Sequence, residues 1–255
     1  MLAEFGLEGR NALVTGGGRG IGRAIALTLA EAGANVAVTA RTMSQVEQVA
    51  NEVRELNRGS HAVQVDVGNA DAVKRMVAEV TGQLGSIDIL VNNAGISGGA
   101  ELAALSDDVW HQILETNLSG PFYCSRAVAP QMQERRSGRI INVSSTSSSM
   151  ATIGGAAYNS SKAALNMLTK VLARECAPYD VGVNAIGPGW FETDMSAKTL
   201  ETPEQRDAAL KNIPMGRLTS LRDLGLLAVY LASPASSWMT GQIIYHDGGQ
   251  TAAFL

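Results

Sequence analysis

The chain has 255 residues, 45% of them hydrophobic, and a formal net charge of -4 at pH 7. This length and apolar content suit one α/β unit, so we predict a single domain over residues 1–255. The weak negative charge, with no dense basic stripe, argues against nucleic acid as a partner.

Membrane, secreted and metal-binding proteins are also disfavoured. No apolar run reaches the roughly 20 residues that span a bilayer, and the first residues do not resemble a secretory signal. We therefore expect a soluble, cytoplasmic protein with no membrane partner. Cys124 and Cys176 are too few for a disulfide framework or a zinc site, and their apolar contexts predict buried free thiols.

Short β-branched runs alternate with helical patterns along most of the chain, which predicts parallel strands joined by right-handed crossovers. Strands are expected over 11–15, 35–39, 62–67, 87–91, 139–144, 181–186 and 242–245. Helices are expected over 23–33, 43–57, 70–84, 109–134, 156–176 and 220–231.

Two stretches depart from this regular alternation. The Gly120-Pro121 pair interrupts the helical pattern of 109–134 and predicts a kink or a junction of two helices there. Between residues 190 and 218 the pattern loosens, with a short helix beginning at Thr202-Pro203. A loose segment of this length in a compact domain is typical of a substrate lid.

A glycine-rich turn follows the first expected strand. Gly16, Gly18, Gly20 and Gly22 stand between that strand and the first helix. Glycines allow a tight turn, and they let a pyrophosphate approach backbone N–H groups where the helix dipole favours an anion. The turn therefore predicts a dinucleotide site, and a plain structural turn is the weaker interpretation.

Tyr158 and Lys162 are four residues apart in an expected helix, so their side chains share one face. A phenol beside an ammonium group, with a serine hydroxyl arriving from a strand end, can donate and accept a proton near neutral pH. By itself the pair is equally typical of a surface aromatic resting on a lysine stem.

The motifs occur together in one order: the glycine turn, Asn92-Asn93-Ala94-Gly95, Asn117, Tyr158-x-x-x-Lys162 and Pro188-Gly189. In this the chain resembles the short-chain dehydrogenase/reductase family over nearly its whole length. The resemblance implies an α/β fold with a Rossmann-type, doubly wound parallel sheet of seven strands in the order 3-2-1-4-5-6-7 and helices on both faces.

The resemblance also implies a catalytic set of Asn117, Ser145, Tyr158 and Lys162. Tyr158 would be the general acid or base, and its pKa would be lowered by Lys162 and the positive nicotinamide ring. Ser145 would hydrogen-bond the substrate oxygen, and Asn117, at a break in its helix, would hold a relay water. The serine is Ser145 rather than Ser144, because the family places it thirteen residues before the tyrosine. Ser148 stands where the family often has glycine.

Cofactor preference follows from the end of the second strand. NAD-preferring relatives carry a carboxylate there, whereas this chain has Ala40 followed by Arg41, with Arg19 in the glycine turn. Two guanidinium groups suit a 2′-phosphate, which predicts NADP(H) in preference to NAD(H). The full set of implied cofactor contacts is Gly16, Gly18, Arg19, Gly20, Ile21, Gly22, Arg41, Asp66, Val67, Asn93, Ala94, Gly95, Tyr158, Lys162, Pro188, Gly189, Phe191 and Thr193.

The substrate pocket is expected to include Ser97, Thr152, Ile153 and Trp190, with the lid around Met195 to Met215. Trp190 and Met195 are equally typical of lid packing. No metal site is expected. His61, His111 and His246 match no catalytic role in the family.

The sequence therefore favours an enzyme that interconverts a ketone and a secondary alcohol. It resembles the gluconate 5-dehydrogenase and 3-oxoacyl-carrier-protein reductase branches of the family. Carrier-protein reductases use basic residues to dock an acidic partner, and two such positions match Arg136 and Tyr179. The second is not basic, which weakens the interpretation as a carrier-protein reductase. The alternative from another class is a catalytically silent NADP-binding sensor or scaffold. The resemblance further implies a homotetramer, with helices 109–134 and 156–176 as candidate interfaces.

Overall fold

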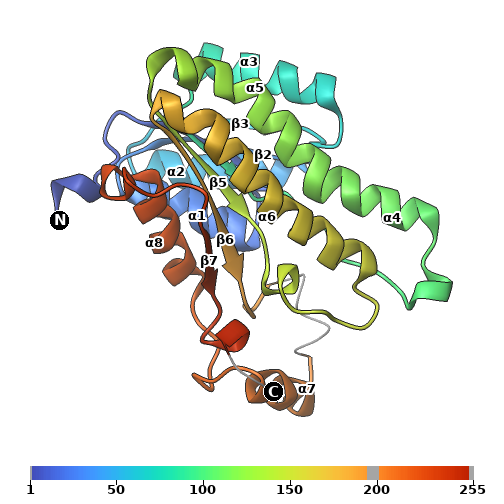
Figure 1. Cartoon of the computed structure of the whole chain (residues 1–255). Helices are drawn as coiled ribbons and strands as arrows, with labels where there is room; N and C mark the ends of the chain where they lie inside the picture. Colours follow the sequence, from blue (N-terminus) through green and yellow to red (C-terminus); the bar gives the residue numbers. More distant parts are fainter. Residues whose placement is uncertain (1, 194–200, 253–255) are drawn as a thin grey trace.

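The computed structural model describes residues 2–193 and 201–252 and shows one sheet between two layers of helices (Figure 1). Seven strands lie in the order β3-β2-β1-β4-β5-β6-β7, and every neighbouring pair is parallel. The strands are β1 Asn11–Thr15, β2 Asn35–Ala40, β3 Ser60–Gln64, β4 Ile89–Asn92, β5 Gly138–Val143, β6 Val181–Pro188 and β7 Ile243–His246. The predicted Rossmann-type topology and strand order are confirmed.

Each face of the sheet is covered by its own helices and its own apolar core. One face carries α1 Gly20–Glu31, α2 Met43–Glu55 and α8 Leu221–Ala232. The other carries α3 Ala70–Leu84, α5 Gly120–Arg135 and α6 Ala156–Cys176. α4 Asp107–Leu114 runs on towards α5, and α7 Pro203–Lys211 lies beyond the carboxyl ends of the strands (Figure 1). Among the described residues, no helix is long and apolar enough to cross a bilayer.

The third strand differs from its predicted bounds of 62–67. β3 covers Ser60–Gln64, and the chain then leaves the sheet. Val65 and Val67 remain buried after the strand has ended. The last residue pair between β2 and β3 is Ala40 with Gln64. The alternation of buried and exposed residues continues past that pair, which is why the predicted strand was too long.

The long helical pattern of 109–134 also divides differently. A π-helical turn, Glu115–Ser119, joins α4 to α5, so the break lies just before the predicted Gly120-Pro121 position. Pro121 has no N–H to donate to the carbonyl of Asn117 four residues earlier, and the widened turn accommodates that loss. Asn117 thus lies in the break, as predicted, and its side chain is fully buried.

The loops after β1 and β4 form the switch point of the sheet, because the chain leaves these neighbouring strands towards opposite faces. The Thr15 hydroxyl joins the two loops. Its Oγ1 accepts the N–H groups of Asn93 and Ala94 at 3.0 and 3.1 Å. A crevice at this edge of the sheet follows from the topology.

A substitution at Gly22 tests how tightly the glycine turn packs against α1. A Cβ added at Gly22 would lie 2.2 Å from the carbonyl oxygen of Gly16. Gly22→Ala should therefore lower the free energy of unfolding by about 2 kcal/mol or more through overpacking. The matched control is Gly82→Ala in α3, where an added Cβ meets nothing within 4 Å. The control should raise stability by about 0.5–1 kcal/mol, and chemical denaturation of both variants measures the contrast.

Candidate active site

A cavity of about 750 Å³ opens at the carboxyl ends of the strands. Its walls come from the glycine turn, the ends of β2 and β4, the segment after β5, the first turns of α6 and the segment after β6. The structure brings together all of the predicted catalytic, cofactor and substrate residues except Asn117 and Ile153. Those lining the cavity are Gly16, Gly18, Arg19, Gly20, Ile21, Gly22, Arg41, Asp66, Val67, Asn93, Ala94, Gly95, Ser97, Ser145, Thr152, Tyr158, Lys162, Pro188, Gly189, Trp190, Phe191 and Thr193.

The glycine turn is fastened to the loop after β4. The side-chain amide of Asn93 donates to the carbonyl oxygens of Thr15 and Gly16, each at 3.0 Å. These bonds hold the turn beneath the β4 loop, so the N-terminus of α1 faces the cavity. Such a helix N-terminus beside backbone N–H groups suits a pyrophosphate.

The end of the cavity beside β2 carries positive charge. Arg19 and Arg41 are both exposed and line the cavity, whereas the last residue of β2 is the uncharged Ala40. Gln45 also lines this end, although the sequence analysis did not single it out. It lies at the start of α2, a position that no motif marks. Guanidinium groups at this end can bind an anionic group through charge-assisted hydrogen bonds.

The reactive groups gather at the other end of the cavity. Ser145 follows β5, while Tyr158 and Lys162 project from the first turns of α6. The Ser145 side chain lies beside the Tyr158 phenol, near enough to lower the pKa of that group. The Lys162 ammonium donates to the carbonyl of Val143 at 2.8 Å and lies 5.8 Å from the Tyr158 ring centroid. A serine hydroxyl, a phenol and an ammonium group therefore lie close together at this end of the cavity.

Burial shifts the pKa of both titratable groups. It raises the pKa of Tyr158 above its ordinary value, and the Ser145 side chain opposes that rise. It lowers the pKa of Lys162 to about 8. The predicted lowering of the Tyr158 pKa by Lys162 is therefore not found in the chain alone, because desolvation of the phenol dominates. A positive nicotinamide ring would act in the opposite sense to this desolvation.

Asn117 lies behind the cavity. Its Oδ1 accepts the N–H of Ile96 at 2.8 Å, and its Nδ2 donates to the Ile96 carbonyl at 2.9 Å and to the Ser161 hydroxyl at 3.1 Å. Asn117 thus fastens the segment after β4 to α6. The relay role implied by family resemblance stays a prediction.

The predicted substrate residues divide into two groups. Ser97, Thr152 and Trp190 line the cavity, whereas Ile153 does not and is 94% exposed. Ile153 falls in the loop before α6, where sequence patterns do not fix side-chain direction. Met195 lies outside the described residues. Met150 and Gln250 line the cavity although no motif marks them.

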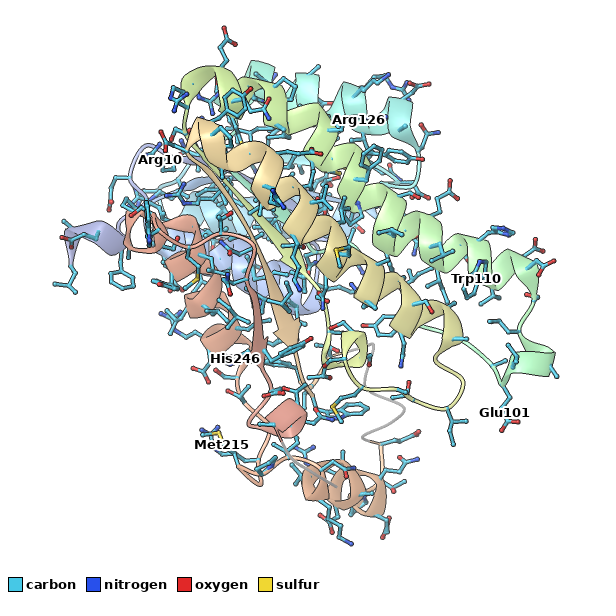
Figure 2. The ribbon with its side chains drawn as sticks, viewed as in Figure 1. Arg10, Glu101, Trp110, Arg126, Met215 and His246 are labelled. Atoms are coloured by element: carbon cyan, nitrogen blue, oxygen red, sulfur yellow. The ribbon has the colours of Figure 1, made fainter. Side chains whose placement is uncertain are left out.

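Trp190 also borders a neighbouring cavity of about 680 Å³. Met215 and His246 form part of the wall of this second cavity (Figure 2). His246 is the last residue of β7, so the cavity lies at the carboxyl end of the sheet. The His246 ring stacks on Phe191 with centroids 6.1 Å apart, and Phe191 lines the first cavity. His246 is therefore a packing neighbour of the site. No group of His, Cys, Asp or Glu within residues 2–193 and 201–252 could hold a metal ion.

Comparison with known proteins identifies the family. Residues 16–251 match the family model described as enoyl-(acyl carrier protein) reductase. The 3-oxoacyl-(acyl-carrier-protein) reductase of Staphylococcus epidermidis is 42% identical over 241 residues, which is 94% of this chain and 98% of that protein. This chain is a short-chain dehydrogenase/reductase. It is accordingly an oxidoreductase.

Solved structures of similar proteins have nearly the same fold. A gluconate 5-dehydrogenase from Burkholderia cenocepacia, in complex with NADP and tartrate, has a TM-score of 0.95 at 38% identity and covers 98% of both chains. The RhlG/NADP active-site complex of Pseudomonas aeruginosa has a TM-score of 0.93 at 35% identity, covering 98% of this chain and 100% of that one.

The buried lysine of this short-chain dehydrogenase/reductase should reduce its stability. Lys162→Met should raise the free energy of unfolding at pH 7 by about 2 kcal/mol, because removing the buried charge outweighs the lost hydrogen bond to Val143. Below pH 8 the lysine is charged in both folded and unfolded chains, so its cost is fully present. The difference between variant and wild type should shrink as pH rises from about 8 towards the ordinary lysine pKa.

Denaturant titrations at several pH values measure this effect. Lys170→Met is the matched control, because Lys170 is exposed on the same helix. A Lys162→Met variant that is less stable than the wild type at pH 7 would contradict the burial argument.

Proposed function

We propose that this protein is an NADP(H)-dependent oxidoreductase that interconverts a ketone and a secondary alcohol. One observation carries the proposal: Ser145, Tyr158 and Lys162 line the same cavity as the glycine turn. A bound dinucleotide whose pyrophosphate lies at that turn would extend towards these three residues. The proposal therefore places one reactive centre at the nicotinamide end.

The proton is handled by the chain itself. Tyr158 donates its phenolic proton to the substrate carbonyl oxygen in reduction and accepts a proton from the alcohol in oxidation. Ser145 donates a hydrogen bond to the same oxygen and stabilises its developing negative charge. The Lys162 ammonium lies 5.8 Å from the Tyr158 ring centroid and is expected to hold the cofactor ribose. A nicotinamide cofactor, when bound, would supply or accept the hydride.

The preference for NADP(H) is supported by charge at the β2 end of the cavity. Arg19 and Arg41 line that end, and the last residue of β2 is Ala40 rather than an acid. Guanidinium groups bind a 2′-phosphate through charge-assisted hydrogen bonds. Solved relatives of this fold contain NADP.

A second candidate is 3-oxoacyl-(acyl-carrier-protein) reduction, because curated relatives with that name are 42% identical to this chain. The structure adds a constraint on carrier docking. Arg136 and Tyr179 immediately precede β5 and β6, whereas the cavity lies at the carboxyl ends of those strands. Arg136 is also bonded to the carbonyl of Pro178 and paired with Asp180. A carrier protein docked at these residues would lie at the amino ends of the strands, on the opposite side of the sheet from the cavity of the same chain.

The other expectations follow the family. We propose a homotetramer acting on a small carbonyl or alcohol substrate in the cytoplasm, with no nucleic acid or membrane partner. A silent NADP-binding scaffold is disfavoured because Ser145, Tyr158 and Lys162 remain together at the cavity.

The substrate class is tested by measuring NADPH oxidation with three panels of compounds: small ketones, keto-acids of the gluconate type, and 3-oxoacyl thioesters. Binding of NADPH without turnover of any panel would support the scaffold instead.

Tyr158→Phe should reduce kcat about 10²- to 10⁴-fold, because the ring remains while the transferable proton is lost. The dissociation constant for NADPH should change little. Tyr230→Phe is the control, because Tyr230 lies on α8 and packs near Phe5. Steady-state NADPH oxidation and cofactor fluorescence measure the two quantities. Near-normal turnover by Tyr158→Phe would exclude the phenol as the proton donor.

Arg41→Ala should lower kcat/KM for NADPH about tenfold or more and leave that for NADH nearly unchanged. The reason is that only NADPH has the 2′-phosphate that the guanidinium group would bind. Arg75→Ala is the control, because Arg75 is exposed on α3, away from the cavity. A wild-type enzyme that prefers NADH would contradict the assignment of Arg19 and Arg41.

A further inference from the structure

The loop after Ser145 contains a hydroxyl that does not line the cavity. Ser148 lies in the 3-10 turn η4 Thr146–Ser148. Its hydroxyl donates to the carbonyl of Ser145 at 2.6 Å, and its backbone N–H donates to the same oxygen at 3.1 Å. Ser145, Thr146 and Ser147 line the cavity, but Ser148 does not. Ser148 therefore contacts the backbone of the reactive serine from behind.

Two side chains from distant parts of the chain hold the Ser148 hydroxyl. Asn166 of α6 donates its amide N–H to Ser148 Oγ at 2.8 Å. The Tyr245 hydroxyl of β7 lies 3.0 Å from the same atom. The Tyr245 ring is seated over Gly187 of β6, where an added Cβ would lie 2.4 Å from the ring. The edge strand of the sheet thus reaches the loop beside the reaction centre.

The donors and acceptors of this cluster form one consistent pattern. Because the Ser148 O–H points to the Ser145 carbonyl, Ser148 Oγ accepts from both Asn166 and Tyr245. The Asn166 carbonyl oxygen in turn accepts the hydroxyl of Ser144 at 2.7 Å. Both residues that follow β5 are therefore bonded to the same cluster. Connected polar groups of this kind restrict side chains to one arrangement.

The arrangement bears on where the Ser145 hydroxyl points. The N–H of Ser147 donates to Ser145 Oγ at 3.1 Å, which makes Ser145 the N-cap of the Thr146–Ser148 turn. We propose that Ser148, held by Tyr245 and Asn166, is a positioning residue that keeps the Ser145 hydroxyl directed at Tyr158 and the substrate oxygen. This inference rests on the proposed function, in which Ser145 stabilises the reacting oxygen.

Ser148→Ala tests the inference. It should lower kcat for an active ketone about tenfold, since small misplacements of a reacting group are costly, while KM and the NADPH dissociation constant stay within about twofold. The pH dependence of kcat should move to higher pH, because a displaced Ser145 no longer favours the Tyr158 phenolate. Ser149→Ala is the matched control. Ser149 donates to the carbonyl of Thr146 within the same loop but has no bond to Tyr245 or Asn166.

Tyr245→Phe provides a second variant that keeps the ring over Gly187. It should lower kcat by a smaller factor, and the Ser148→Ala/Tyr245→Phe double variant should be no slower than Ser148→Ala, because both act through one atom. Equal kcat and equal pH profiles for Ser148→Ala and Ser149→Ala would overturn the inference. A raised KM at unchanged kcat would overturn it too, since that indicates a substrate contact.

Amide hydrogen exchange separates this inference from the proposed function. The Ser147 amide should exchange faster in Ser148→Ala than in the wild type or Ser149→Ala, with no substrate present. If the wild type reduces no carbonyl compound, the proposed function fails, yet this exchange still tests whether Ser148 closes the turn. Unchanged exchange at Ser147 would overturn the positioning role whatever the activity.

Discussion

The hydrogen bond from the Lys162 ammonium to the carbonyl of Val143, at 2.8 Å, joins the helix that carries the reactive groups to the strand that precedes the reactive serine. The Lys162 side chain is buried at the cavity wall, and burial lowers the pKa of its ammonium group to about 8. Burying an ammonium group is unfavourable unless neighbouring groups compensate for lost hydration. The structure tolerates that cost at the point where α6 must stay in register with β5. The buried Lys162 ammonium group thus lowers the stability of the fold at the position where the proposed reaction needs a positive charge.

A second set of buried bonds holds the same helix farther along. Asn142 of β5 donates to the hydroxyl of Thr169, seven residues beyond Lys162 and on the same helical face. Asn142 also accepts from Asn92 of β4, whose amide reaches Ser125 of α5. These bonds cross two strands and two helices. They restrict α6 to one position over the sheet, and so they determine where Tyr158 meets Ser145.

The two ends of the cavity depend on different kinds of structure. The dinucleotide end is built from backbone and glycine, so its residues are marked by a local motif between β1 and α1. The reactive end is assembled from the segment after β5 and the first turns of α6, and β7, which is distant in sequence, holds the loop between them through Tyr245. Ser145, Tyr158 and Lys162 were nevertheless found, because two are helical neighbours and the third has a set spacing in the resembling family. Asn166 and Tyr245 have no such marker, since their link to Ser148 exists only in the folded chain.

Element boundaries show the same division. The α6 bounds matched the prediction because its apolar spacing is regular, whereas β3 ended earlier because Val65 and Val67 stay buried outside the sheet. Ile153 was expected in the pocket but points outward, because the backbone of a loop, rather than any periodicity, decides its direction.

The sequence by itself determined the alternation of strands and helices, the glycine turn and the paired Tyr158 and Lys162, because period, turn chemistry and helical spacing are local properties. The strand order was implied by the resemblance to the family. Only the tertiary structure decided the raised pKa of the phenol, the bonding of Asn117 to Ile96 and the fastening of Ser148 to β7. Those features arise from desolvation and from contacts between distant segments, and neither is encoded in any single stretch of residues.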